Sequence, residues 1–101
     1  MERTYKVGLS KGKRRIWIDG APLSTHGFIG GASYHCYATP GSIVLTLERA
    51  GDGGAVRRVT GRPDGKPIVD IVGRTVDTAL ASDVTRVRVT FHAGIITIKG
   101  E

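Results

Sequence analysis

The residues best suited to chemistry in this sequence are basic side chains that gather in two segments, together with one tryptophan. The 101 residues include 15 Lys and Arg against 9 Asp and Glu, a formal net charge of +6. Residues 1–15 hold six of the basic side chains against one acidic one, and residues 48–67 hold five against three. Lysine and arginine bind phosphate, and an indole ring stacks on a base. The candidates for nucleic-acid contact are Lys6, Lys11, Lys13, Arg14, Arg15, Trp17, Arg57, Arg58, Arg62 and Lys66.

The same features have simpler explanations that the sequence leaves open. A positive surface also keeps a small domain soluble and needs no partner. The indole of Trp17 fits the core of a small barrel, the usual place of a large aromatic side chain. Arg86 and Arg88 alternate with apolar residues and fit the solvated face of a strand. We therefore leave these two arginines out of the candidate set.

Histidine and cysteine offer little for catalysis. The possible metal ligands are His26, His35, Cys36 and His92. No pair among them has the usual spacing of a zinc site, and adjacent strand residues such as His35 and Cys36 point to opposite faces. A ribonuclease would need a general base and a phosphate clamp, which His35 or His92 beside Arg88 could supply. Outward histidines on strands need no such role, so we expect no enzymatic activity, metal or cofactor.

Short strands and tight turns must position these side chains. Fifteen glycines recur between β-branched runs, a pattern typical of many short strands. The residue after Gly20-Ala21 is a proline, which suits the first turn of a helix. The alternation of apolar and polar residues predicts strands at 5–9, 14–19, 32–38, 43–47, 55–60, 68–72, 85–92 and 95–98. Short helical turns are expected at 22–26 and 75–81.

A shift of 53 residues superposes one stretch of the chain on another. It places Gly20 on Gly73 and Gly41 on Gly94, and six apolar positions coincide as well. Self-similarity at a fixed offset indicates an internal repeat. We divide the single domain, residues 1–101, into a basic arm with the first strand (1–13), repeat one (14–48), a connector (49–67) and repeat two (68–101).

These elements carry a family resemblance. From Arg15 the chain reads R-I-W-I-D-G-x-x-L-x-x-x-G-F-x-x-G, followed by a strand, a turn and I-V-L-T-L. This pattern resembles the SymE-type branch of the AbrB/SpoVT swapped-hairpin families. The whole chain is also similar to the N-terminal extension of cytosine-5 DNA methyltransferases of plasmids and mobile elements, with Val59-Thr60-Gly61 at the connector. The methyltransferase catalytic region has no counterpart here, so that activity is not carried over.

The resemblance implies both a fold and a function. The expected fold is all-β with one or two short helical turns, a small barrel made from two swapped-hairpin-like repeats. Relatives of the AbrB kind bind DNA as dimers, so we expect a DNA-binding regulator or accessory protein of a mobile element. Its partner would be duplex DNA, contacted by the arm and connector, and a homodimer is a further expectation. Two alternatives stay open: a phage or mobile-element protein that inhibits a host defence complex, and a SymE-like toxin directed at RNA.

Composition also bears on location. No apolar run approaches the roughly 20 residues of a membrane span, and the N-terminal segment lacks the apolar core of a signal peptide. The single cysteine excludes an intrachain disulfide, which fits a reducing compartment. We therefore expect a cytoplasmic protein without a membrane partner.

Overall fold

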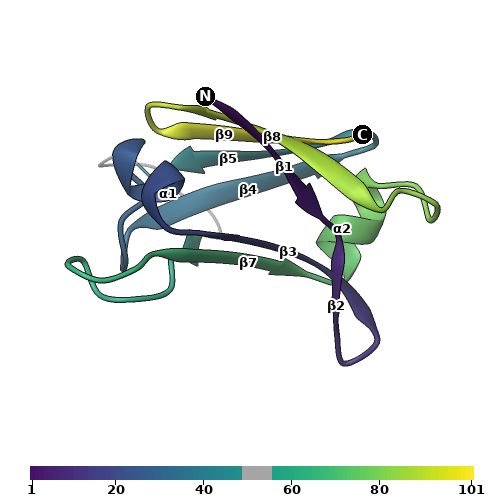
Figure 1. Ribbon diagram of the computed structural model, residues 1–101, viewed down its shortest axis with the longest axis horizontal. Helices are drawn as coiled ribbons and strands as arrows, with labels where there is room; N and C mark the ends of the chain where they lie inside the picture. The colour runs from purple at the N-terminus through teal and green to yellow at the C-terminus, as the bar shows by residue number, and fades with distance from the viewer. Residues whose placement is uncertain (49–55) are drawn as a thin grey trace.

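The computed structural model describes residues 1–48 and 56–101, which form two β-sheets packed face to face with a short helix at each end (Figure 1). The strands are β1 (Glu2–Lys6), β2 (Gly8–Ser10), β3 (Lys13–Asp19), β4 (Ser33–Thr39), β5 (Ser42–Leu47), β6 (Arg57–Arg58), β7 (Ile68–Val72), β8 (Arg86–His92) and β9 (Ile95–Gly100). The helices are α1 (Ala21–Thr25) and α2 (Arg74–Ala79). The all-β class expected from the sequence is confirmed.

Both sheets are antiparallel. The larger has the strand order β1-β8-β9-β5-β4-β6, and the smaller has the order β2-β3-β7. The hairpins β4–β5 and β8–β9 are joined by pairing between β5 and β9 at the centre of the larger sheet. The smaller sheet lies across its inner face, with β3 and β7 paired along five residues.

Apolar side chains fill the space between the sheets. Along β3, Ile16 and Ile18 are fully buried while the intervening Trp17 is exposed. Along β8, Val87 and Val89 are buried in the same alternating way. A strand with one face in the core and one in solvent requires this period of two. Burial of each such side chain contributes about 1.5–3 kcal/mol to stability.

Each helix follows a glycine that only a residue tolerant of positive φ can replace. Gly20 ends β3 at φ +83° and Gly73 ends β7 at φ +80°, and the chain turns there into α1 or α2. Leu23 and Val76 then point into the core from the two helices. Within the described residues, no helix is long and apolar enough to cross a membrane.

The expected closed barrel is not formed, because the hydrogen-bond ladders stop where strands cross from one sheet to the other. The chain pairs with β8 along β1, bends at Val7, and then pairs with β3 along β2. On the other side, β6 pairs with β4, and an isolated bridge between Thr60 and Ile68 links this segment to the smaller sheet. The result is two packed sheets linked by bent segments.

The structure repeats itself at the 53-residue offset of the sequence. This shift carries β4 onto β8 and β5 onto β9 at both ends of each strand. Trp17 lies opposite Asp70 in the β3–β7 ladder, and Val44 lies opposite Thr97 in the β5–β9 ladder. Each of these pairs joins residues 53 apart, so a pseudo-two-fold axis passes through both ladders.

The strands before β3 and β7 are also related by this axis. The N–H of Val7 donates to the carbonyl of Thr85, and the N–H of Val59 donates to the carbonyl of Ala32, both at 2.8 Å. The offset here is 52, because the loop that follows is one residue longer in the second half. Val7 belongs to the segment assigned as the arm and Val59 to the segment assigned as the connector. These two segments thus occupy equivalent positions about the axis. The rest of the expected connector, residues 49–55, lies outside the described residues.

Candidate nucleic-acid interface

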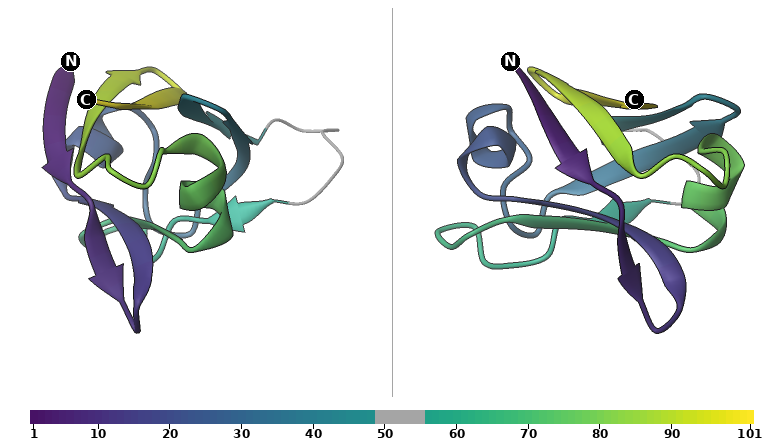
Figure 2. Two further views of the ribbon diagram at one scale, coloured as in Figure 1. Left: turned by 90° about the vertical axis from the view of Figure 1, so that its right-hand side faces the viewer. Right: turned by 45° about the vertical axis from the view of Figure 1, so that its right-hand side comes forward.

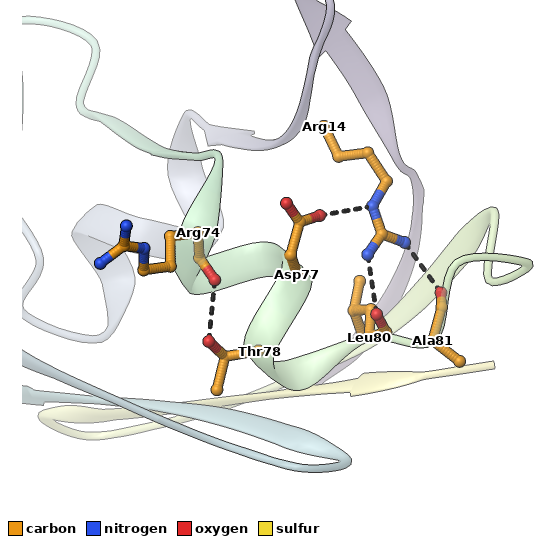
Figure 3. A network of polar contacts seen from close by, with 6 residues as sticks. All are labelled: Arg14, Arg74, Asp77, Thr78, Leu80 and Ala81. Carbon is orange, nitrogen blue, oxygen red and sulfur yellow. Dashed lines mark hydrogen bonds and ion pairs between the residues drawn. The ribbon is translucent and has the colours of Figure 1, made fainter.

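Arg14, at the start of β3, makes hydrogen bonds to α2 and to the segment that follows it. Its Nε donates to Oδ1 of Asp77 at 2.9 Å, and its terminal nitrogens donate to the carbonyls of Leu80 at 2.7 Å and Ala81 at 2.8 Å (Figure 3). The side chain is only 20% exposed. All three guanidinium nitrogens are engaged, so Arg14 ties β3 to α2 and to the segment after it.

Arg15 is paired on the outer face of the smaller sheet. Its Nε and Nη2 donate to the two carboxylate oxygens of Asp70 at 2.8 and 2.9 Å, a bidentate geometry. This hydrogen bonding raises the pKa of Arg15 above its usual value. The guanidinium carbon also lies 4.2 Å from the ring centroid of Trp17, close enough for a cation–π contact. Arg15 therefore has its charge compensated within the protein.

Trp17 lies on the surface and not in the core. The side chain is 40% exposed, and its Nε1 donates to Oδ2 of Asp19 at 3.2 Å. Nζ of Lys66 lies 3.2 Å from the same oxygen. Hydrogen bonds from Lys66 and then from Trp17 lower the pKa of the Asp19 carboxyl. Lys66 is thus also paired with a carboxylate.

The arginines of the expected connector are dispersed. Arg57 is half-buried and donates from Nη2 to Oγ1 of Thr75 at 2.8 Å. Arg58 is exposed on the edge strand β6, and Arg62 is exposed in the loop between β6 and β7. A Cβ on Gly30 would collide with the backbone of Arg62, so a glycine is needed for this loop to pack closely. Arg57 is therefore bound to Thr75, while Arg58 and Arg62 are exposed on two different segments.

Five exposed basic residues belong to the β2–β3 hairpin, to the start of α2 and to the neighbouring ends of β1 and β8 (Figure 2). We call this set the basic end. It comprises Lys6, Lys11, Lys13, Arg74 and Arg86.

Four members of the basic end lie close together as two pairs. Lys6 on β1 lies directly opposite Arg86 on β8. Lys13 and Arg74 line one pocket of about 370 Å³, and the Cδ of Lys13 passes 3.6 Å from where a Cβ would stand on Gly73. No ion pair joins any of the five to another residue of the ranges 1–48 and 56–101.

Sequence reasoning found only part of the basic end. Lys6, Lys11 and Lys13 were candidates, whereas Arg74 was missed and Arg86 was set aside as part of a solvated strand face. Arg86 is exposed on β8, and the same outward position makes it a cross-strand neighbour of Lys6. The position of Arg74 in the sequence was informative, because it directly follows Gly73. The N–H of Gly73 donates to the carbonyl of Arg14 on β3, which places Arg74 beside that strand.

The histidines and the cysteine show no metal site within the part of the chain that the structure describes, where no three possible ligands gather. Cys36 is half-buried, and burial raises the pKa of its thiol. His35 is only 7% exposed and stacks on Tyr37 with ring centroids 6.1 Å apart. The Cys36 thiol is a poor nucleophile while it keeps its proton.

Arg88, the phosphate clamp considered for a ribonuclease, is paired with an acidic residue. Its Nε lies 3.1 Å from a carboxylate oxygen of Glu2.

A larger, mostly apolar pocket adjoins the basic end. It has a volume of about 510 Å³ and lies between α2, the β4–β5 turn and the end of β9. Asp77 and Thr78 line both this pocket and the smaller one that contains Lys13 and Arg74. The two pockets therefore adjoin each other at these two residues, and together we call them the depression along α2.

No protein-family model, curated protein or solved structure gives a significant match to this chain. The function has to be argued from the geometry of the chain itself.

Proposed function

We propose that this protein is a non-enzymatic DNA-binding module that contacts phosphate groups with the basic end. The observation that carries the proposal is the division among the basic side chains. Arg14, Arg15 and Lys66 are neutralised by carboxylates, whereas the five cations of the basic end have no acidic partner in the described residues. Unpaired surface cations that cluster attract a polyanion and release its counterions on binding.

The shape of this end supports the same conclusion. The β2–β3 hairpin extends beyond the body of the molecule, and Lys11 lies at its turn (Figures 1 and 2). A projecting two-stranded ribbon can approach a nucleic-acid groove, where lysine and arginine contacts to phosphate fix the orientation. A role in regulating a mobile element rests on the sequence resemblance alone and stays a prediction.

The test is a titration of the protein with labelled duplex DNA, single-stranded DNA and RNA at 50 and 200 mM salt. If all five cations contact phosphate, affinity falls by about 500-fold between these concentrations. Unchanged affinity would overturn the electrostatic mechanism. Cleavage of RNA would favour the toxin alternative, and a lack of binding to all three would favour a protein partner. Size-exclusion mass on the same sample gives the oligomeric state.

A further inference from the structure

The apolar pocket beside α2 is lined in part by small residues at positions where the other half of the sequence carries large ones. The 53-residue offset relates Phe28 to Ala81 and Leu47 to Gly100. Phe28 is fully buried and Leu47 packs on the core, whereas Ala81 and Gly100 line the pocket. Within the described residues, no aromatic ring is buried at this point of the second half, where Ala81 is exposed and the neighbouring Leu80 is buried.

The charged residues in the lining of the apolar pocket are Asp77 and Glu101, and the cations lie in the adjoining pocket. Pro40, Ala79, Leu80 and Val84 supply most of the lining of the apolar pocket. Beyond Asp77 and Thr78, the adjoining pocket presents the charges of Lys13 and Arg74. The carboxylate of Asp77 is already bound by Arg14, so it does not neutralise these two (Figure 3).

The guanidinium of Arg74 is directed away from this network. Figure 3 shows its side chain extending to the side opposite Asp77, while its backbone carbonyl accepts a hydrogen bond from Thr78 at 2.9 Å. The depression along α2 thus offers apolar contact at one end and two available cations at the other. It suits a ligand with a flat, weakly polar body and an attached anionic group.

We propose that this depression binds one unpaired nucleotide of DNA, with the base in the apolar pocket and a neighbouring phosphate at Lys13 and Arg74. The inference rests on the proposed function and specifies what the basic end recognises. A volume of about 510 Å³ lies in the range of small-molecule sites. Extruded bases are held between apolar side chains and by polar groups at their edges, and the lining of this pocket includes the polar residues Thr78 and Glu101.

The experiment compares oligothymidylate of about 12 nucleotides with an abasic oligonucleotide of the same length, which keeps the phosphates and lacks the bases. The wild-type protein is expected to bind the oligothymidylate at least about tenfold more tightly. Ala81→Phe adds an aromatic ring at an exposed residue that lines the pocket, and it should abolish this preference while leaving abasic binding unchanged. Ser82→Phe, which adds the same ring at an exposed neighbouring residue outside the pocket, should retain the preference.

The outcomes separate the two proposals. Equal binding of both oligonucleotides by the wild type, or a preference that survives Ala81→Phe, overturns the base pocket and leaves the DNA-binding proposal standing. No binding of either one overturns the DNA-binding proposal itself.

A measurement on the wild type covers the case in which Ala81→Phe does not fold. Thymidine 5′-monophosphate should shift the amide resonances of Gly41 and Gly100, which line the pocket. Gly94 is the internal control. The 53-residue offset relates it to Gly41, but it lies beside Leu47 and does not line the pocket. Shifts at Gly94 alone, or at none of the three, would contradict the proposal.

Discussion

Arg14 and Arg15 are adjacent in the sequence but contact different parts of the protein. Arg14 points toward α2 and is nearly enclosed, whereas Arg15 lies on the outer sheet face over Trp17. The period of two along a strand separates them, and each finds its own carboxylate. Charge alone therefore does not identify the side chains that are free to bind a partner.

Arg14→Ala should destabilise the fold by about 1–3 kcal/mol, because the carbonyls of Leu80 and Ala81 and the carboxylate of Asp77 lose their donor. Urea unfolding measures the change. Lys11→Ala, at the exposed turn, is the control and should stay within about 0.5 kcal/mol of wild type. Equal stability of the two variants would show that the Arg14 contacts contribute nothing to the fold.

Tyr34 should make the protein sensitive to alkali. Burial raises the pKa of its phenol to about 12 from the ordinary value of 10.0. Between these pH values the folded state keeps a proton that the unfolded state has lost, so stability falls as pH rises through this window. Tyr34→Phe should flatten that decline in urea midpoints measured from pH 9 to about 11.5. Tyr37→Phe, at an exposed ring, should not.

At the scale of elements, the β2–β3 hairpin carries two members of the basic end, Lys11 and Lys13, on a projecting two-stranded ribbon. Its strands are joined by Lys11 and Gly12, both at positive φ, of +51° and +79°. Such a tight turn fixes the backbone of Lys11 within it and of Lys13 directly after it. A lysine held in this way loses less conformational entropy on binding than one on a long loop.

Replacing both hairpin lysines, Lys11→Gln and Lys13→Gln, should weaken binding to duplex DNA. Each lost phosphate contact should also reduce the slope of log affinity against log salt by about 0.9. Fluorescence anisotropy over a salt series gives both quantities. Arg62→Gln removes an exposed charge from the loop between β6 and β7, and we expect a smaller effect. A larger loss for Arg62→Gln would move the interface to that loop.

At the scale of the whole molecule, much of the fold was accessible from the sequence. The alternation of Ile16, Trp17 and Ile18 predicts a strand with one buried face, and the glycines at positions 20 and 73 mark where the strands end. These are local signals, and they depend on neighbouring residues only. The offset of 53 residues added a prediction that local signals do not give, namely that the chain consists of two equivalent halves.

The rest depended on contacts that no local pattern encodes. The partner of Arg14 is 63 residues away, and the partner of Arg15 is 55 residues away. The pocket beside α2 is lined by residues as far apart in the sequence as Pro40 and Glu101, which only the fold brings together. The relation between Val7 and Val59 was hidden by a one-residue difference in loop length.

The internal two-fold axis predicts matched stability effects in the two halves. Ile18 and Ile71 are equivalent and both are fully buried, on β3 and β7. Ile→Val at either position should cost about 0.5–1.5 kcal/mol, and the two costs should agree to within about 0.5 kcal/mol. Guanidinium unfolding of the two single variants tests this expectation. A clearly larger loss at one site would show that the halves share an outline but differ in packing.

The residues on the axis show what a single chain permits. In a dimer of identical subunits, a position on the symmetry axis faces its own copy, so it must be compatible with itself. An aspartate there would oppose an aspartate, with mutual repulsion. Here Trp17 faces Asp70, and this heterogeneity allows Asp70 to bind Arg15. Covalent linkage of the halves thus frees each from self-complementarity, and a site built in one half occurs once per molecule.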